Sequence, residues 1–245
     1  MTLLKTKLEN FTRLSASDRD EIDRLASKSV RAFGARRDLV REGDPPRTMF
    51  LMLEGWACRY KMLADGRRQI FALFLPGDLC DLNIFLLREM DHNVGAISAL
   101  SVAEIGREDF DGMIARAPRI AQALAWQELV TIAIQREWTL NIGQRSAFER
   151  IAHLLCEMFL RLQSVALTRG DSCDFLLTQN DLADATGLTA VHVNRTLQEL
   201  RRIGLIELRG RVLRIPDLDA LKQAALFNGN YLHLGREGRH LDAND

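Results

Sequence analysis

The stretch that decides the fold runs from Leu177 to Ile206 and reads LTQNDLADATGLTAVHVNRTLQELRRIGLI. Thr178 is followed three residues later by Asp181, which is the spacing of a capping box at the start of a helix. Gly187 permits a left-handed turn, and Thr189 is suited to cap a second helix. Two short helices joined by a tight turn are therefore predicted, which is a helix-turn-helix.

The second helix of this pair has an apolar side and a polar side. Val193 and Leu197 lie one turn apart and are expected to face the core. The opposite side carries residue types that read DNA bases, because Arg bonds guanine, Asn bonds adenine and apolar groups touch the thymine methyl. Polar side chains and amides at the helix starts suit phosphates. The candidate DNA-binding residues of the two helices are Thr178, Gln179, Thr189, Ala190, Val191, His192, Asn194, Arg195 and Gln198.

A basic hairpin is expected directly after these helices. The runs 205–209 and 211–215 flank Gly210 and predict a two-stranded wing. From residue 177 to residue 215 the chain has six arginines and four acidic residues, a local net charge of +2. This excess is small but favours a polyanionic partner, double-stranded DNA. The wing adds Arg209 and Arg211 to the candidate DNA-binding residues.

The whole chain has a neutral, globular composition. Its 245 residues are 47% hydrophobic and 27% charged, and 33 basic residues balance 33 acidic ones. Nucleic-acid binding must therefore depend on local charge. No apolar run approaches the ~18 residues of a membrane span, and residues 1–10 lack the apolar core of a signal peptide. We expect a cytoplasmic protein with no membrane partner.

The four cysteines give no sign of a metal centre. Cys58, Cys80, Cys156 and Cys173 are scattered, with no C-x-x-C pair and no zinc-ligand spacing. Buried or idle thiols in a reducing compartment are expected.

The N-terminal half is predicted to be mostly β. A polar helix is expected around 17–29 with Ser17 as its N-cap, and short β-rich runs alternate with Gly, Pro and Asp turns after it. Such spacing is typical of a sandwich or jelly roll and not of a βαβ sheet. The chain is thus expected to be α+β, with a double-stranded β-helix at its N-terminus. The β-rich runs are Leu39-Val40, Met49 to Leu53, Ala57 to Met62, Gln69 to Leu75 and Val94 to Ile105.

A long helix is predicted from Pro118 to about Leu140. Its apolar residues are spread over more than one face, whereas a single core needs one stripe. The surplus predicts burial against a partner subunit and hence a homodimer. A helix wrapped entirely by its own chain remains the alternative.

These patterns divide the chain into four segments. We expect a β-rich domain at 1–117, a dimerisation helix at 118–141, a DNA-binding domain at 142–227 and a mobile polar tail at 228–245. The break at Asn141-Ile142-Gly143 precedes an amphipathic helix over 145–162, so residues 141–144 are the expected hinge.

Several short motifs accompany the winged helix-turn-helix along the chain: Glu42-Gly43-Asp44, Gly55, Pro76-Gly77-Asp78, Val102-Ala103-Glu104-Ile105, Phe110, Pro118 and Arg150-Ile151-Ala152. With these landmarks, the chain resembles the CRP/FNR family of bacterial transcription regulators from Phe11 to about Leu221. The resemblance implies a cyclic-nucleotide-binding-type β-roll that makes 1–117 the sensor domain, a long dimerisation helix and a winged helix-turn-helix that reads a two-fold symmetric operator. It also implies contact with RNA polymerase.

The sensory site departs from the members that bind cyclic AMP, whose phosphate cassette uses a Gly-Glu pair and an Arg-Ser pair. Met90-Asp91 stands here where Arg-Ser is expected, so an anion would meet a carboxylate. This exchange argues against cyclic AMP, although a cyclic-nucleotide-responsive regulator with an atypical pocket remains an alternative. The candidate effector-pocket residues are Cys80, Asp81, Met90, Asp91, Gln135 and Arg136.

Other cofactors are not identified by the sequence. Iron-sulfur members carry a cysteine cluster near the N-terminus, whereas the first cysteine here is Cys58, which argues against such a cluster. Cys80 and His92 near the expected pocket leave a haem or thiol switch open as an alternative, and a regulator without any effector is a further one.

The recognition helix also departs from many family members, which place a Glu where Val191 stands here. The Arg195 contact to guanine is retained, so a different operator is expected. An enzyme is not expected: the chain has no P-loop, G-x-S-x-G or H-E-x-x-H motif and thus no candidate catalytic residue. His92 is the only histidine of the β-rich part, so a cupin-type metal site cannot form there.

Overall fold

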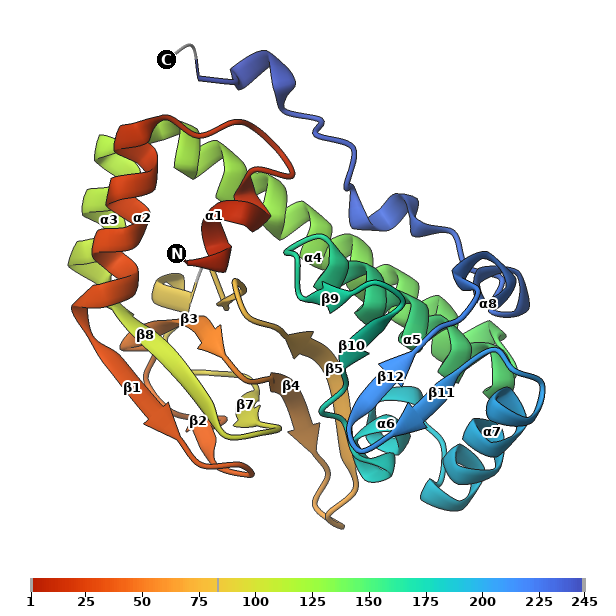
Figure 1. Cartoon of the computed structure of the whole chain (residues 1–245). Helices are drawn as coiled ribbons and strands as arrows, with labels where there is room; N and C mark the ends of the chain where they lie inside the picture. Colours follow the sequence, from red (N-terminus) through yellow and green to blue (C-terminus); the bar gives the residue numbers. More distant parts are fainter. Residues whose placement is uncertain (1, 83, 244–245) are drawn as a thin grey trace. The chain divides into compact units, whose positions relative to one another are not determined.

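The computed structural model describes residues 2–82 and 84–243 (Figure 1). The chain divides into two compact units. The first unit spans Met1–Lys61, Ala72–Ile132 and His233–Asp245. The second spans Met62–Phe71 and Ala133–Leu232.

Two four-stranded antiparallel sheets form the β-roll, and this confirms the predicted jelly roll. The first sheet has the order β1 (Val30–Phe33), β8 (Leu100–Gly106), β3 (Thr48–Glu54) and β6 (Leu79–Cys80). The second has the order β2 (Asp38–Val40), β7 (Asn93–Ala96), β4 (Ala57–Met62) and β5 (Arg68–Phe74).

The strands differ from the predicted runs in two ways. The run Val94 to Ile105 is two strands in different sheets, because a bend over residues 97–99 separates β7 from β8. Strands β1 and β6 had no clear sequence signal. Most of β1 is solvent-exposed and β6 has only two residues, so neither shows an apolar alternation.

Short helices complete the first unit: α1 (Leu3–Leu8), α2 (Ala16–Lys28), the 3-10 turn η1 (Ile84–Leu86) and α3 (Arg107–Arg116). The N-cap of α2 is Ser15, whose side chain accepts a hydrogen bond from the Asp18 amide at 3.1 Å. Asp18 in turn accepts from the Ser15 amide at 3.0 Å. The expectation of Ser17 as the cap is therefore wrong, because Asp18 stands three residues after Ser15 and closes a capping box there.

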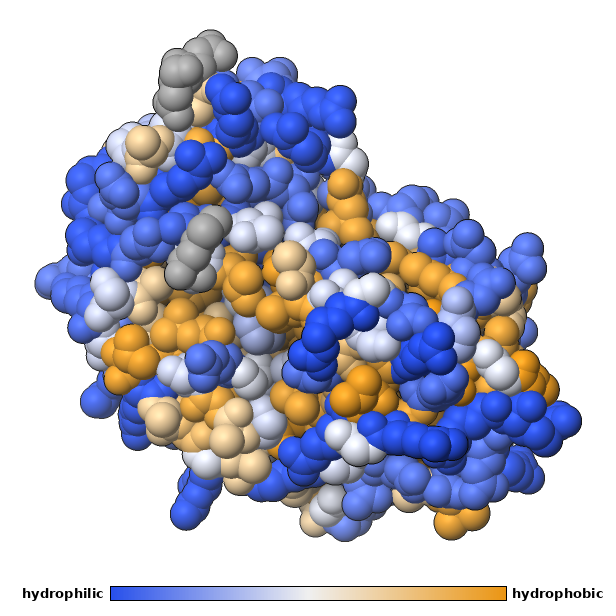
Figure 2. Space-filling view, viewed as in Figure 1, coloured by the Kyte–Doolittle hydropathy of each residue, from blue (hydrophilic) through white to orange (hydrophobic). Residues whose placement is uncertain are grey.

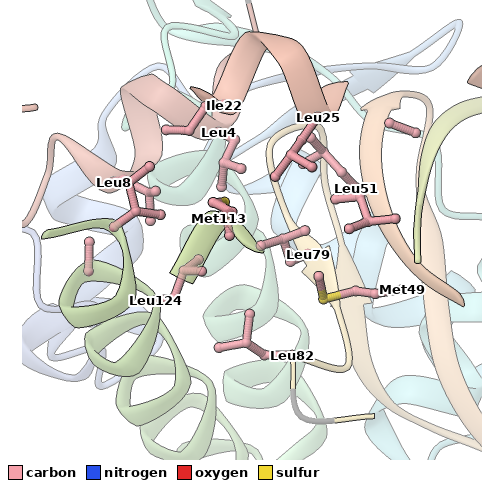
Figure 3. Close-up of a cluster of buried hydrophobic side chains, with 14 of the residues drawn as sticks. Leu4, Leu8, Ile22, Leu25, Met49, Leu51, Leu79, Leu82, Met113 and Leu124 are labelled. Atoms are coloured by element: carbon pink, nitrogen blue, oxygen red, sulfur yellow. The ribbon is translucent and has the colours of Figure 1, made fainter. Parts of the chain in front are cut away.

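The main core of the first unit lies between the helices and the first sheet, as Figure 3 shows. Leu4 and Leu25 come from α1 and α2, and they pack with Leu51 of β3 and Leu79 of β6. A second cluster, including Met52 from the first sheet and others from the second, fills the space between the sheets. Burial of each such side chain stabilises the fold by about 1.5–3 kcal/mol.

Helix α4 is one continuous helix over Pro118–Gln144. The predicted end near Leu140 and the break at 141–143 are thus wrong. Asn141 is buried, and its Nδ2 donates to the Arg150 carbonyl over 3.4 Å, so this turn is held in the helix by its packing. A Cβ at Gly143 would meet nothing within 4 Å, so this glycine is not required by a close approach.

The second unit carries the winged helix-turn-helix. Helix α5 (Ala147–Gln163) starts at Ser146, which forms a capping box with Glu149. One sheet has the order β11 (Glu207–Arg209), β12 (Val212–Arg214), β10 (Ser172–Asp174) and β9 (Thr168–Arg169). The remaining helices are α6 (Gln179–Thr186), α7 (Ala190–Arg202) and α8 (Leu218–Ala224).

The C-terminal segment is packed onto the fold, in contrast to the expected mobile tail. Tyr231 and Leu232 in the 3-10 turn η2 (Gly229–Leu232) are buried in the second unit. Beyond η3 (Arg239–Leu241), Asp242 accepts from the Arg13 amide at 2.6 Å within the first unit. A few apolar anchors suffice to hold a segment whose overall composition is polar. Residues 244 and 245 of the expected tail lie outside the described residues.

Among residues 2–82 and 84–243, no helix combines the length and the apolarity that a bilayer crossing requires.

Candidate nucleic-acid interface

The first helix of the pair begins as its sequence indicates. The Thr178 hydroxyl accepts from the Asp181 amide at 3.2 Å, and Asp181 Oδ2 accepts from the Thr178 amide at 2.9 Å. Gly187 ends α6 in the left-handed region with φ 67°. The turn therefore has the geometry that its glycine was expected to supply.

The second helix presents a polar face. Thr189 caps α7 by accepting from the His192 amide at 3.2 Å. Val193 and Leu197 are buried, whereas the side chain of Val191 is 82% exposed. Because buried and exposed residues alternate with the helical period, one face of α7 is left for a partner. On that face Arg195 and Gln198 are exposed, and Ala190, His192 and Asn194 are half-buried.

Hydrogen bonds order the side chains across the two helices. Asn194 Nδ2 donates to Gln179 Oε1 over 3.2 Å, and Gln198 Nε2 donates to Asn194 Oδ1 over 2.9 Å. Arg195 Nη2 lies 3.2 Å from His192 Nε2. These five predicted DNA-binding residues are therefore brought together, and the link from α6 to α7 was not foreseen from the sequence.

The wing forms as predicted, with Gly210 at φ 55° between β11 and β12. The side chains of Arg209 and Arg211 are exposed next to this turn. Arg214 instead forms ion pairs with Asp171 at 2.8 Å and with Glu207 at 2.9 Å. Hydrophilic residues prevail over the region of the winged helix-turn-helix on the face seen in Figure 2.

One further residue contacts this motif and was not predicted from the sequence. Arg68, in the part of β5 that belongs to the second unit, donates from Nη2 to Asp181 over 2.8 Å. Its Nε donates to Asp184 over 2.6 Å. A single arginine at a strand start, more than a hundred positions from its partners, has no signature in the sequence.

The expected effector pocket contains a chain of charged groups. Asp81 accepts a hydrogen bond from Arg59 and lies 3.1 Å from His92 Nε2. His92 Nδ1 lies 2.6 Å from Asp91 Oδ1. Asp81 and His92 are buried, while the Asp91 side chain is 79% exposed. The acidic groups that the sequence placed here are thus engaged by the chain's own cationic and imidazole groups.

The contacts among these side chains favour the charged forms of Asp81 and His92. Burial alone raises the pKa of Asp81, but the His92 hydrogen bond and the Arg59 charge outweigh burial and leave the pKa lowered. Burial alone lowers the pKa of His92, but the hydrogen bonds that its ring donates to Asp81 and Asp91 leave it raised. Each group therefore stabilises the charge of the other.

The remaining pocket candidates lie in other settings. Met90 is a buried core residue whose carbonyl accepts from the Gly43 amide at 2.7 Å. Gln135 and Arg136 are on α4 in the second unit, half-buried and exposed respectively. Within the first unit the structure thus brings Asp81 and Asp91 together through His92.

All four cysteines are buried. Burial raises the pKa of Cys80 well above its ordinary value and raises the pKa of Cys156 and Cys173 to about 12. A protonated thiol is a weak nucleophile and a weak metal ligand, so Cys80, Cys156 and Cys173 are suited to packing in the core and not to reaction. In the part of the chain that the structure describes, no three His, Cys, Asp or Glu side chains are arranged to hold a metal ion.

Comparisons with known proteins match both units. A cyclic nucleotide-binding domain family matches residues 30–117, and a Crp-like helix-turn-helix domain family matches residues 149–224. Transcriptional activator protein FnrL of Cereibacter sphaeroides is 30% identical over 202 residues, covering 79% of each chain. Nitrogen fixation regulation protein FixK of Bradyrhizobium diazoefficiens is 29% identical over 196 residues, with the same coverage. The solved structure of FixK2 from Bradyrhizobium japonicum aligns with a TM-score of 0.72 at 25% identity, covering 80% of this chain and 96% of that one.

Proposed function

Because the chain belongs to the CRP/FNR family of DNA-binding transcription regulators, we propose that it is a homodimeric activator that binds a two-fold symmetric operator and contacts RNA polymerase. Activation is proposed because FnrL is a transcriptional activator by name. We assign sensing to residues 1–117, dimerisation to α4 and DNA binding to the segment from its end to residue 227.

The observation that carries this proposal is the exposed face of α7. Arg195 is the group that bonds guanine through two donors, and Val191 offers methyl groups to a thymine. Thr178 and Gln179 at the start of α6 face the phosphates in this assignment, together with Arg209 and Arg211 of the wing. Since Val191 cannot accept a bond from cytosine, the operator differs from one read by a glutamate at that position.

An apolar stripe on α4 supports the homodimer. The side chains of Leu129, Ile132 and Leu140 are 63%, 39% and 46% exposed. Their spacing of three and then eight residues places them on one side of a helix that turns every 3.6 residues. A second copy of α4 would cover this stripe and set the two recognition helices about 34 Å apart, one DNA turn.

The chain of charged groups around Asp81 supports control by something other than cyclic AMP. Asp81 and Asp91 would repel a cyclic phosphate, and Arg59 is already engaged by Asp81. The alternative, a cyclic-nucleotide-responsive regulator, predicts a large rise in thermal midpoint with cyclic AMP or cyclic GMP. A ligand at 100 times its dissociation constant adds about 2.7 kcal/mol to stability, so an unchanged midpoint would reject that alternative.

The decisive experiment is selection of bound duplexes from a random DNA pool by the purified protein, under air and with reductant. The proposal expects one motif with two symmetric half-sites about one helical turn apart. The buried thiols lead us to expect the same motif in both conditions. A motif in one condition only would support redox control, and an asymmetric motif would contradict the dimer. No enriched motif, even with cyclic nucleotides added, would contradict DNA binding.

A further inference from the structure

Arg68 forms a two-pronged contact with the first helix of the DNA-binding motif. Its side chain is 21% exposed, and its Nη2 and Nε reach Asp181 and Asp184 at 2.8 Å and 2.6 Å. The segment Met62–Phe71, which carries Arg68, lies in the same compact unit as α6. The guanidinium fork thus bridges two carboxylates that stand three residues apart on one helix.

One of these carboxylates also forms the cap of α6. The side chain of Asp181 is fully buried. Its Oδ2 accepts from the amide and the hydroxyl of Thr178, at 2.9 Å and 2.7 Å, while Oδ1 accepts from Arg68. A buried carboxylate is costly unless a cation compensates it. Arg68 therefore stabilises the form of Asp181 that shapes the first turn of α6.

Arg68 also changes the net charge next to the proposed phosphate contacts. Asp181 and Asp184 carry two negative charges on α6, and uncompensated they would repel the DNA backbone. Segment 62–71 contains two arginines and one aspartate, and thus brings one net positive charge to this place. Removal of Arg68 should therefore weaken DNA binding, because no cation would then compensate the repulsion between the two carboxylates and the phosphate.

We propose that Arg68 is a positioning residue for operator binding, which acts by holding and neutralising Asp181 and Asp184 so that Thr178 and Gln179 meet a backbone phosphate. This inference rests on the proposed function, because it concerns how the same surface binds DNA. It assigns segment 62–71 a part in DNA binding that the helix-turn-helix sequence alone does not indicate.

The test compares Arg68→Ala, Arg68→Lys and the neighbouring control Arg67→Ala in the full chain. Arg67 is a suitable control because its side chain is 76% exposed and pairs with Asp65 of its own hairpin. We expect Arg68→Ala to weaken operator binding about tenfold, the scale of a charged hydrogen bond. Arg68→Lys should recover part of this loss, since an ammonium lacks the fork. Arg67→Ala should stay within about twofold, as exposed pairs contribute little.

A second measurement separates positioning from a general loss of stability. An operator with a neutral methylphosphonate in place of the phosphate next to Thr178 should bind the wild type more weakly. In Arg68→Ala the same change should cost clearly less, because the two changes act on one contact. Asp184→Asn keeps the cap and removes one of the two carboxylates that Arg68 neutralises, so it gives a usable variant if Arg68→Ala does not fold. With one negative charge fewer beside the phosphate, its operator affinity and its methylphosphonate penalty should rise.

The outcomes are distinct. An unchanged operator affinity for Arg68→Ala, or an undiminished methylphosphonate penalty in that variant, would overturn the inference while leaving the regulator intact. For a non-folding Arg68→Ala, an operator affinity and a methylphosphonate penalty that do not rise in Asp184→Asn would overturn it in the same way. A wild-type protein that selects no operator would instead contradict the proposed function.

Discussion

Trp138 Nε1 donates a buried hydrogen bond to Glu157 Oε2 over 2.9 Å and thereby joins the last turns of α4 to α5. The hydroxyl of Tyr231 donates to the same oxygen over 3.0 Å. Nearby, Arg145 pairs with Glu137 at 2.7 Å. Because these contacts bind the end of α4 to the DNA-binding unit, residues 141–144 are poorly suited to act as the expected hinge.

Tyr231→Phe should destabilise the protein by about 1–3 kcal/mol, because it leaves the buried Glu157 with one donor fewer. The phenyl ring keeps the packing against Phe227, so the loss reports on the hydroxyl. Denaturant unfolding measures the change. The control is Tyr60→Phe, which removes a hydroxyl that donates to Asp38 in the first unit. Equal stability of wild type and Tyr231→Phe would show that the C-terminal segment does not secure this network.

Because of His153, the free energy of unfolding should fall as the pH is lowered into mild acid. Burial, followed by the charge of Arg145, lowers the pKa of His153 to about 3, although Glu137 lies 3.1 Å from its ring. Arg145 already pairs with that carboxylate, so burial dominates. The unfolded chain binds a proton below pH ~6.5 and the folded chain does not, so stability falls between pH ~6.5 and about 3, by up to ~1.4 kcal/mol per unit from this group.

The measurement is urea unfolding of wild type and His153→Gln between pH 7 and pH 5. The variant should show a flatter dependence. The raised pKa of His92 acts in the opposite sense, since its contribution is present below its unfolded pKa and is lost as pH rises through the folded value. An equally steep curve for His153→Gln would reject this assignment.

Arg195→Ala should lose about 1–3 kcal/mol of specific operator binding with little change on random DNA. Its side chain is exposed on α7, where it is suited to read a base edge. Titration of labelled operator and of a scrambled duplex at one salt concentration measures both affinities. The comparison variant Arg211→Ala should weaken both duplexes alike, as a wing contact to phosphate does. Equal weakening by Arg195→Ala would assign it to the phosphate contacts instead.

Two glycines should respond oppositely to alanine. Gly143 lies within α4 and its added Cβ meets nothing within 4 Å, so Gly143→Ala should stabilise by about 0.5–1 kcal/mol. Gly187 adopts φ 67°, where an L side chain is strained, so Gly187→Ala should destabilise by about 1 kcal/mol. Unfolding midpoints of the two variants and the wild type show whether each substitution stabilises or destabilises the protein. A destabilised Gly143→Ala would show that residue 143 needs a conformation outside the helix.

Leu129→Asp should convert the protein to monomers, because it buries a carboxylate in the proposed interface between two α4 helices. Sedimentation velocity reports the mass directly. Leu86→Asp is the matched control, since Leu86 is 79% exposed on η1 and lies outside α4. A Leu129→Asp protein that remains dimeric, or a wild type that is already monomeric, would contradict the interface.

Local features could be predicted from the sequence because their causes lie within a few residues. The cap at Thr178, the turn at Gly187 and the cap at Thr189 each depend on hydrogen bonds or backbone angles spanning three or four positions. The same reasoning failed at α2, where Ser15 and Ser17 compete and only the partner Asp18 decides between them.

Contacts between distant segments were decided by the tertiary structure alone. Arg68 meets Asp181, and Arg59 meets Asp81, because the β-strands bring these side chains together, and no local pattern encodes such a meeting. The continuation of α4 to Gln144 likewise depends on packing around Asn141. The sequence alone determined the caps and the turn of the helix-turn-helix and which face of α7 stays polar, since these depend on local patterns. The tertiary fold determined where α4 ends and which charges pair, since packing and ion pairs depend on distance in space.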